Sequence, residues 1–586
     1  MEYAAITDIY EKIEATTKRL EITNLLVGLF SKTPSDEIDK IVYLTQGKLY
    51  PDYRGIELGI ANKLAIRSLA QASATSEKEI SQDLNRTGDL GTTAANFLEK
   101  KIQLTLSKVP LTVTRVYETL DRVARAGGEG SQDLKIRLLA SLMTDSGTRD
   151  AKYIVRTATG KLRLGLADMT ILDALAIAFG GSKEARPEIE RAYNLSSDLG
   201  AVAKTVAQAG LKGLKTYAIS VGKPIRAMMA ERLSTPQEIL EKLGGKGAAE
   251  YKYDGERLQV HKNGRDVALY SRRLENVTSH YPDACDLVRQ QLNAKKSIVE
   301  CECVALNPET GELLPFQELM HRRRKYQVAE AMTLYPVSLF VFDALLIENE
   351  DLTSQPYTER RRLLKKIVKD SQGLKLAKAK TVDTVQALEE FFQEAIADGC
   401  EGLIVKSLQT NSVYQAGARG WLWIKYKRDY QVLLSDTVDL AVIGAFHGMG
   451  RRARSYGALL VAAYDSEKDM FQSVCKVGSG FTDEDLDKLP SMLHQHEVKR
   501  AHPRVDSLIV PDVWLNPQVI LEIVGSEITL SPIHTAARNL IRIDSGLAIR
   551  FPRFTGNYRM DKSAQDATTV IELMQMYKRQ LKKIVV

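Results

Sequence analysis

The sequence predicts a multidomain fold in which an all-α region, an α/β (α+β) region and an all-β region follow one another. Its 586 residues are too many for one hydrophobic core, because cores stop growing at about 250–300 residues. Hydrophobic residues make up 44% and charged residues 26% of the chain, which is ordinary for a globular protein. The hydrophobic pattern changes twice along the chain. We therefore expect three domains, at residues 1–220, 221–430 and 431–586.

The first region is predicted to be helical. Apolar residues recur there at helical spacing, first within the opening 20 residues (Ile6, Ile9, Tyr10, Ile13 and Leu20) and again at Leu134, Leu138, Leu139 and Leu142. Glycine pairs such as Gly180-Gly181 separate the helices, and residues 222–224 (Gly-Lys-Pro) close the region. The domain boundary is therefore expected near residue 220.

The other two regions are predicted to contain sheets. In the second region, helical pieces such as 359–368 alternate with short β-rich runs at 259–261, 267–270, 297–306, 338–342 and 403–407. In the third region, glycine-bearing loops separate strands at 439–446, 456–464, 472–477 and 519–524. This last pattern is typical of a small barrel, and we expect a helix from about 569 to 583 to follow it.

Charge and cysteine content limit the class of protein. Lys and Arg number 81 against 74 Asp and Glu, so the net charge of +7 is small and any basic nucleic-acid surface must be local. The five cysteines include no CxxC pair, which argues against a zinc module or a disulfide scaffold. The N-terminus lacks a signal-peptide pattern, and no run of about 18 apolar residues occurs. We expect a cytoplasmic protein without a membrane segment.

A lysine motif of the form K-x-D-G-x-R provides the main chemical signal. Its fixed positions are Lys252, Asp254, Gly255 and Arg257. Four such positions occur by chance in a chain of this length with a probability on the order of one in a hundred. In a strand, Lys252 and Asp254 share one face, and Gly255 allows a tight turn or a close approach to a ligand. Taken alone, the motif is better explained as a charged turn at the end of a surface strand.

The lysine motif is followed, in order, by four more segments with reactive or ligand-binding residue types. They contain Glu300 and Glu302, then Phe342, then Glu401 and Lys406, and finally Trp423, Lys425 and Lys427. Glu300 and Glu302 share a strand face, where two acids repel each other unless a cation or ligand hydroxyls meet them. A core aromatic or a solvated strand end explains each segment singly but not the whole series.

Together these residues describe a nucleotidyl-transfer pocket. Lys252 is suited to act as an amine nucleophile, and Lys425 and Lys427 can bind phosphate oxygens. Glu302 and Glu401 suit ribose hydroxyls or a magnesium ion. An aromatic such as Phe342 can stack on a base, a contact whose loss costs roughly 1–3 kcal/mol. The sequence has no P-loop, so we expect side chains to hold the phosphates.

The ordered set resembles the covalent nucleotidyltransferases, and most closely the ATP-dependent DNA ligases of the archaeal and eukaryotic replicative type. The resemblance makes Lys252 the adenylated lysine, Glu250 the reader of the adenine amino group and Phe342 the adenine-stacking aromatic. Glu302 matches the acid at the ribose and metal, and Glu401 is a second metal candidate. Further ATP contacts are implied at Arg257, Arg272, Arg419, Lys425 and Lys427, with supporting roles for Asp254, Gly255, Lys406 and Trp423.

The resemblance covers nearly the whole chain. Residues 550–554 and 559–562 are similar to the family's sixth motif on an OB-fold domain, where Arg550 and Lys562 would orient the pyrophosphate of ATP. Residues 161–166 are similar to a segment of the family's helical DNA-binding domain. One departure is Cys301, where the family commonly has glycine between the two acids. We expect this change to affect packing more than chemistry.

The activity implied is sealing of nicks in duplex DNA, in replication, repair and recombination. Lys252 would take AMP from ATP with magnesium, AMP would pass to the 5′-phosphate of the nick, and the 3′-hydroxyl would displace it. We expect a monomer, associated with the nucleoid if the chain is archaeal. RNA ligase or GTP-dependent capping activity is an alternative within the superfamily, and a non-catalytic DNA-binding scaffold is one outside it. Use of ADP, GTP or NAD in place of ATP stays open.

A short segment in the helical region is similar to the clamp-binding loop of archaeal ligases. Gln103 and Leu106 match its glutamine and its first hydrophobic anchor, but Ser107 stands in place of the first aromatic. An ordinary helix end is an equally good interpretation. Binding to a sliding clamp is therefore a hypothesis that rests on two residues.

Overall fold

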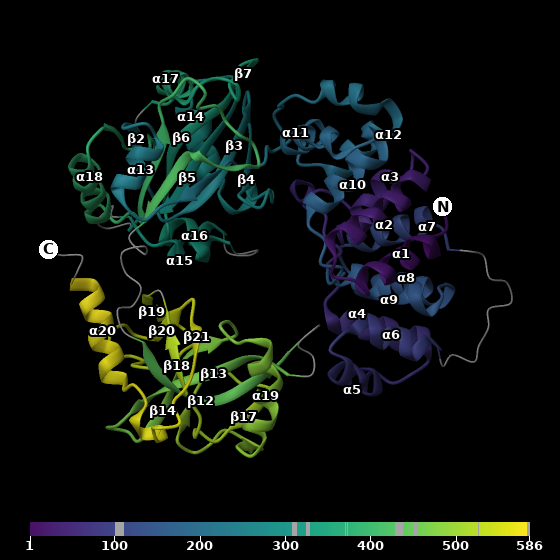
Figure 1. Ribbon diagram of the computed structural model, residues 1–586, viewed down its shortest axis with the longest axis vertical. Coiled ribbons are helices and arrows are strands. Elements are labelled where there is room, and N and C mark those ends of the chain that lie inside the picture. The colour runs from purple at the N-terminus through teal and green to yellow at the C-terminus, as the bar shows by residue number, and fades with distance from the viewer. Residues whose placement is uncertain are drawn as a thin grey trace. The chain divides into compact units, whose positions relative to one another are not determined.

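The structure is a computed structural model that describes residues 1–99, 111–307, 313–323, 328–369, 371, 373–427, 437–448, 455–525 and 527–582. It divides into two compact units, one made of Met1–Asn85 and Leu90–Tyr426 and the other of Arg86–Asp89 and Lys427–Val586. The first unit contains the helical and α/β regions, and the second contains the β-rich region (Figure 1). The predicted order of three fold classes along the chain is confirmed.

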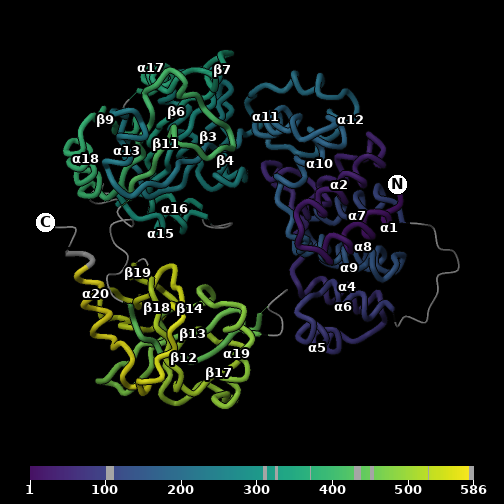
Figure 2. Tube along the Cα trace, viewed as in Figure 1, coloured from purple at the N-terminus to yellow at the C-terminus, as the bar shows by residue number. Residues whose placement is uncertain are grey.

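Helices make up the regular structure in the described part of residues 1–216 (Figure 2). The first helix, α1, buries Tyr3, Ile6, Tyr10 and Ile13 on one face, as the periodicity predicted. Leu20 departs from that pattern: α1 ends at Glu14, and Leu20 belongs to the next helix, where it is 69% exposed. The α-helices are α1 (Tyr3–Glu14), α2 (Arg19–Lys32), α3 (Ile38–Thr45), α4 (Asn62–Ser73), α5 (Glu77–Thr87), α6 (Leu90–Glu99), α7 (Val113–Arg125), α8 (Ser131–Asp145), α9 (Thr148–Ala158), α10 (Asp168–Gly180), α11 (Arg186–Ser196) and α12 (Leu199–Gly213).

The α/β region contains two sheets. The first has the order β1-β11-β10-β2-β9 and is formed by β1 (Met229–Arg232), β2 (Gly247–Lys252), β9 (Ala379–Val382), β10 (Gly402–Ser407) and β11 (Arg419–Lys427). Helices α13 (Pro236–Lys242) and α18 (Val385–Ala397) pack side by side next to it (Figure 1). The Thr384 hydroxyl caps α18 by accepting a hydrogen bond from the Ala387 N–H.

The second sheet has the order β4-β3-β5-β6-β7, with β8 also paired to β6. Its strands are β3 (Glu256–Asn263), β4 (Asp266–Ser271), β5 (Lys296–Ala305), β6 (Val337–Ile347), β7 (Glu350–Asp351) and β8 (Leu374–Leu376). Around it lie α14 (Pro282–Gln291), α15 (Phe316–Leu319), α16 (Val328–Leu334) and α17 (Tyr357–Ile367). Cys301 and Cys303 point into the core of this sheet, which fits the packing role expected for Cys301.

The second unit is β-rich, and its main sheet is largely antiparallel. Strand β12 pairs with β18 through Val438–Ala441 and with β17 through Gly444–Ala445, so one strand joins two others along its length. The elements are β12 (Val438–His447), β13 (Tyr456–Asp465), β14 (Met470–Val477), α19 (Asp483–His494), β15 (Glu497–Val498), β16 (Val505–Asp506), β17 (Val513–Leu515), β18 (Ile520–Val524), β19 (Glu527–Ser531), β20 (Gly546–Arg550), β21 (Arg553–Tyr558) and α20 (Val570–Lys582). The predicted C-terminal helix is confirmed as α20.

A helix that crosses a bilayer needs about 20 predominantly apolar residues in succession. Among the described helices, none is both long and apolar enough to cross a membrane.

Candidate active site

Lys252 is the last residue of β2, and its side chain meets Glu401. The antiparallel register pairs Lys252 with Gly402 of β10, and the Glu401 N–H donates to the Lys252 carbonyl oxygen over 2.8 Å. Lys252 Nζ lies 2.5 Å from Glu401 Oε2, and both side chains are about one-quarter exposed. The pairing of two strands that are distant in sequence therefore brings the lysine motif and the Glu401 segment together.

Gly255 is required by a close approach between strands. A Cβ at this position would lie 2.3 Å from the carbonyl oxygen of Cys303, so a larger residue would push the start of β3 away from β5. The β3–β5 register then sets Arg257 opposite Glu302. The close approach made by Gly255 is thus to a neighbouring strand, and it fixes the relative position of two predicted site residues.

Three acids interact electrostatically at Lys252, and we call these four residues the Lys252 cluster (Lys252, Asp254, Glu302 and Glu401). Burial, followed by repulsion from Glu401, raises the pKa of Asp254 to about 6. Burial also raises the pKa of Glu302 to about 7; Lys252 and Arg257 oppose this shift, and Glu401 and Asp254 add to it. The Phe316 N–H donates to Asp254 Oδ2 over 3.2 Å. The cluster carries more negative charge than its own lysine balances.

The chemistry of this cluster fits a magnesium ion. Magnesium prefers oxygen ligands and usually binds through one or two carboxylates together with water and substrate phosphates. Glu302 and Glu401 supply such a pair, and a dication would relieve the repulsion that raises the pKa of Glu302. In the described ranges, no group of three acidic, histidine or cysteine side chains is arranged to hold a metal ion. The chain therefore offers part of a coordination shell rather than a closed site.

Arg257 separates the roles of the two acids on β5. Its guanidinium donates to Glu300 Oε2 over 2.8 Å and to the Met228 carbonyl oxygen over 2.8 Å. Glu300 is 1% exposed, so Arg257 is the cation that meets this buried acid. Burial opposes ionisation of Arg257, but Glu300 outweighs it and raises the pKa of the guanidinium. Glu302, with no such close partner among the described residues, is the acid left for a ligand.

Phe342 is the partly exposed aromatic in the middle of β6. Its neighbours on both sides in sequence, Val341 and Asp343, are each buried. The ring lies edge-on to Trp423, with centroids 6.2 Å apart, and the Arg257 guanidinium lies 5.3 Å from its centroid. Phe342 is therefore held by its surroundings while part of the ring stays accessible to a ligand.

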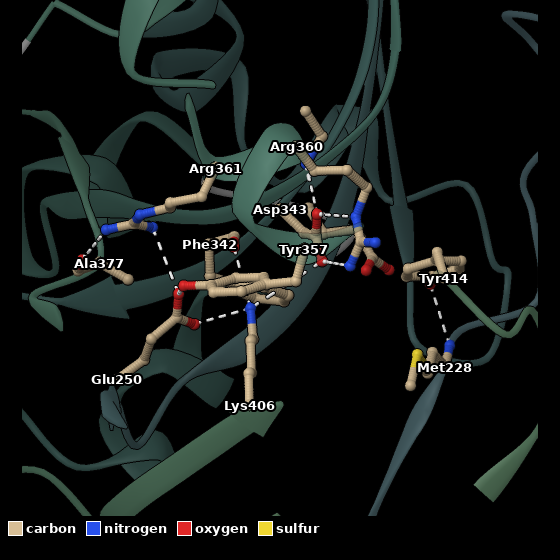
Figure 3. Close-up of polar contacts among 12 residues, drawn as sticks. Met228, Glu250, Phe342, Asp343, Tyr357, Arg360, Arg361, Ala377, Lys406 and Tyr414 are labelled. Carbon is tan, nitrogen blue, oxygen red and sulfur yellow. Dashed lines mark hydrogen bonds and ion pairs between the residues drawn. The ribbon is translucent and has the colours of Figure 1, made fainter. Parts of the chain in front are cut away.

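Glu250 belongs to a second polar set, the α17 cluster (Glu250, Asp343, Tyr357, Arg360, Arg361 and Lys406), which Figure 3 shows. Lys406 Nζ lies 2.7 Å from Glu250 Oε2 and donates to the Phe342 carbonyl oxygen over 3.0 Å. Lys406 is 1% exposed, and burial lowers its pKa although Glu250 and Asp343 oppose the shift. Its ammonium lies 4.4 Å from the Trp423 ring centroid. Lys406 therefore acts on Glu250 and Phe342, beneath the surface of the site.

The remaining predicted residues of the α/β region lie on β11 or next to β4. Lys425 and Lys427 are partly exposed on β11, on the same face as buried Trp423. Arg419 is exposed at the start of β11, and Arg272 is exposed in the turn that follows β4. These side chains lie where they can meet a solvated phosphate, in contrast to Lys406.

Arg550 and Lys562 belong to the second unit. Arg550 donates to Glu527 Oε1 over 2.9 Å at the end of β20, and Lys562 donates to Asp439 Oδ2 over 2.6 Å. Gln103 and Leu106, the predicted clamp-binding residues, lie outside the residues that the structure describes.

Sequence reasoning missed most of the α17 cluster. Tyr357, Arg360 and Arg361 come from a helix that the sequence predicted only as a helical piece at 359–368, with no site residue on it. Arg360 is fully buried and forms two hydrogen bonds with Asp343, of 2.8 and 3.0 Å. One available signal was helical spacing, because Tyr357, Arg360 and Leu364 fall on one face. Asp343, directly after Phe342, was the other.

The chain matches models of three domain families in succession. Residues 2–176 match the DNA ligase N terminus, residues 227–427 the ATP dependent DNA ligase domain, and residues 452–562 the ATP dependent DNA ligase C terminal region. The three matched ranges correspond to the helical, α/β and β-rich regions. The helical, α/β and β-rich regions are therefore each similar to a domain of the DNA ligases.

Curated relatives are similar over their full lengths. DNA ligase 2 of Thermofilum pendens is 54% identical over 99% of this chain and 98% of its own, and the DNA ligase of Staphylothermus marinus is 51% identical over 100% of both. The solved structure Pmar-Lig_Pre. shares the fold, with a TM-score of 0.56 and 16% identity over 95% of this chain and 99% of its own. RNA ligase, capping and scaffold functions are not favoured by these similarities. The chain belongs to the ATP-dependent DNA ligases.

Proposed function

We propose that this ligase seals nicks in duplex DNA with Lys252 as its nucleophile. The position of Lys252 Nζ, 2.5 Å from Glu401 in a cluster with surplus negative charge, is the observation that carries the proposal. The amine attacks the α-phosphorus of ATP, a nitrogen–phosphorus bond forms, and the bond to pyrophosphate breaks. An oxygen of the nick's 5′-phosphate then attacks the AMP phosphorus, the nitrogen–phosphorus bond breaks, and the Lys252 amine is released. The 3′-hydroxyl finally attacks that phosphate, and AMP leaves as the strand is sealed.

The α/β region supplies the nucleotide contacts in this proposal. Glu250 accepts a hydrogen bond from the adenine amino group, and Phe342 stacks on the base. Glu302 binds ribose. The phosphates meet cationic side chains, namely Arg257, Arg272, Arg419, Lys425 and Lys427. Partial exposure of Phe342, Lys425 and Lys427 supports these assignments, and the buried bonds of Arg257 favour an orienting role for that residue.

Glu302 and Glu401 would hold magnesium. When bound, the ion neutralises charge that develops on the phosphoryl oxygens. Gly255 sets the strand spacing, and Asp254 accepts the Phe316 N–H beside the nucleophile. Lys406 and Trp423 support the base pocket from below. Arg550 and Lys562 orient the pyrophosphate of ATP.

The proposed domain bounds, DNA contacts, cellular role and partners also rest on similarity to the ATP-dependent DNA ligases. We propose domains at 1–220, 221–430 and 431–586, with the helical domain as the main DNA-binding part. Contacts to DNA phosphates would be independent of sequence, as an enzyme that seals any nick requires. The protein is proposed to be a cytoplasmic, nucleoid-associated monomer that acts in replication, repair and recombination. Clamp binding through Gln103 and Leu106 is proposed as well.

Covalent labelling tests the nucleophile. The enzyme is incubated with ATP labelled at the α-phosphate and magnesium, then denatured, and the label retained on the chain is measured. We expect Lys252→Ala to abolish labelling and nick sealing. Lys246→Ala, which changes an exposed lysine near the start of the same strand, is the control and should label normally. Label that persists in Lys252→Ala would refute Lys252 as the nucleophile.

The clamp hypothesis has a separate test. A Gln103→Ala, Leu106→Ala double variant should lose stimulation of nick sealing by the sliding clamp while its unstimulated activity persists. Unchanged stimulation would refute the hypothesis.

A further inference from the structure

Tyr357 is a buried tyrosine of the α17 cluster whose hydroxyl contacts the Glu250 carboxylate. Its hydroxyl donates to Glu250 Oε1 over 2.5 Å, and the Arg361 guanidinium lies 3.5 Å from the same oxygen. Lys406 holds the other oxygen over 2.7 Å. Figure 3 shows these three donors reaching Glu250 from α17 and from the strand of Lys406. Both carboxylate oxygens are thereby fixed in direction.

The donors around Glu250 leave one acceptor position of its carboxylate for a hydrogen bond from a ligand. A carboxylate has about four acceptor positions, and the donors at Glu250 are Tyr357, Arg361 and Lys406. An ionised carboxylate only accepts hydrogen bonds, so a further partner must donate one. The 6-amino group of adenine is a donor, whereas guanine presents a carbonyl oxygen at that position. The direction of the last acceptor position therefore decides which purine fits.

We propose that Tyr357 is a specificity-determining positioning residue, which holds Glu250 so that the carboxylate selects a purine with a 6-amino group. This inference rests on the proposed role of Glu250 in reading adenine. Tyr357 does not touch the base; it acts through the orientation of Glu250. Without the hydroxyl, Oε1 keeps only the longer Arg361 contact, and the carboxylate can turn away from the base.

Tyr357 is the partner of Glu250 that can be altered most cleanly. Lys406 also binds the Phe342 carbonyl oxygen, and Arg361 also binds the Ala377 carbonyl oxygen, so changes at either residue disturb more than Glu250. In the part of the chain that the structure describes, the Tyr357 hydroxyl has a hydrogen bond to Glu250 alone. Tyr357→Phe deletes that bond and keeps the ring on which Lys406 packs, 4.8 Å from its centroid.

A matched control lies in the same region. The Tyr281 hydroxyl donates to Glu256 Oε2 over 2.7 Å, and Arg323 pairs with the same carboxylate. Tyr281 and Glu256 are both buried, as Tyr357 and Glu250 are. Tyr281→Phe therefore removes the same kind of hydrogen bond at a glutamate that is not proposed to read the base.

The experiment compares ATP with purine riboside 5′-triphosphate, which has hydrogen in place of the 6-amino group. Rates of covalent nucleotidylation of the full-length enzyme are measured in single turnovers over a range of nucleotide concentrations, for the wild type, Tyr357→Phe and Tyr281→Phe. We expect the wild type to prefer ATP. Tyr357→Phe should lower that preference about tenfold through a slower reaction with ATP. The lost hydrogen bond is to a charged carboxylate, and such bonds contribute more than hydrogen bonds between neutral groups. Tyr281→Phe should keep the wild-type preference.

The outcomes separate this inference from the proposed function. If the wild type does not prefer ATP, Glu250 does not read the amino group, and both ideas fail. If the preference survives in Tyr357→Phe, the positioning role is refuted while the role of Glu250 stands. Equal losses with both nucleotides would show a merely structural role and would also refute it. Should Tyr357→Phe not fold, Tyr357→Met removes the same hydroxyl, and an unchanged preference in that variant would refute the inference.

Discussion

The α/β region contains two groups of buried or half-buried acids whose pKa values are shifted in opposite directions. In the α17 cluster, burial would raise the pKa of Asp343, but Arg360 and Lys406 outweigh burial and hold it below its usual value. In the Lys252 cluster, burial and neighbouring acids raise the pKa of Asp254 to about 6 and that of Glu302 to about 7. The acids of the α17 cluster are paired with Arg360, Arg361 and Lys406, whereas Asp254 and Glu302 of the Lys252 cluster keep raised pKa values.

The difference in charge balance indicates that one cluster has a structural role and the other a chemical role. A balanced buried cluster fixes geometry, because each partner depends on the other. A cluster with uncompensated acids costs stability and is completed only by a ligand, which is where perturbed pKa values gather in enzymes. In the function proposed above, the α17 cluster holds Glu250 and Phe342 in place, and the Lys252 cluster binds phosphate and metal. Changes to the two clusters should therefore affect stability in opposite directions.

The largest effect is expected when the balanced cluster is broken. Arg360→Met leaves Asp343 as a buried charge without its bidentate partner, and removing one member of such a pair costs about 3–5 kcal/mol. We expect this loss in the free energy of unfolding, measured in urea by tryptophan fluorescence. The control is Arg362→Met, two residues further along the same helix, which breaks only an exposed pair with Glu359 and should leave the free energy of unfolding nearly unchanged. Equal losses in the two variants would contradict the comparison.

A gain of stability is expected when the unbalanced cluster loses an acid. The folded-state pKa of Glu302, about 7, exceeds its ordinary value of 4.5, so the folded protein keeps a proton that the unfolded chain releases between those pH values. Glu302 therefore lowers stability as pH rises through that window, and its cost is complete above pH 7. Glu302→Gln should raise the free energy of unfolding by about 1–3 kcal/mol at pH 8, with little gain at pH 4.

The same variant should lose covalent labelling, because glutamine has no anionic oxygen for the metal. Glu300→Gln is the control on the same strand: it removes the partner of Arg257 and should lower stability at pH 8. A Glu302→Gln enzyme that is no more stable than the wild type at pH 8 would show that this acid is already compensated.

The residues of the Lys252 cluster could be named from the sequence because they lie at fixed spacings within strands, and the structure brings them together. Lys252, Asp254 and Glu302 were identified before any contact was known, and the β2–β10 pairing then joined them to Glu401. What the sequence left open was which of two acids on one strand face is available. Glu300 and Glu302 are alike in spacing and the resemblance alone favoured Glu302; in the structure Glu300 is buried and bonded to Arg257 over 2.8 Å, whereas Glu302 is partly exposed.

The α17 cluster was largely invisible in the sequence for a physical reason. A helix with three consecutive arginines favours solvent exposure, and burial of Arg360 depends on Asp343, which another element supplies. Local spacing was also misleading at Leu20. This residue is in helical register with α1 but belongs to the next helix, α2, because the chain leaves α1 at Glu14. Local patterns predict the type of an element and its apolar face. They do not predict which charged side chain finds a buried partner.

The smallest effect expected is stabilisation by magnesium in the absence of nucleotide. If Glu302 and Glu401 bind the ion, magnesium at about five times its dissociation constant should stabilise the wild type by about 1 kcal/mol at pH 8. The effect should shrink at pH 6, because Glu302, with a pKa of about 7, then holds a proton that competes with the ion. Thermal unfolding with and without magnesium measures both values.

Two variants then assign that effect to one of the clusters. Glu302→Gln should abolish it, since the variant removes an anionic oxygen from the Lys252 cluster. Glu250→Gln should retain it, because Lys406 and Arg361 already compensate the acid in the α17 cluster. Retention in Glu302→Gln together with loss in Glu250→Gln would reverse the assignment. The metal would then belong to the cluster that the chain balances by itself, and surplus negative charge would not be what selects a metal position in this fold.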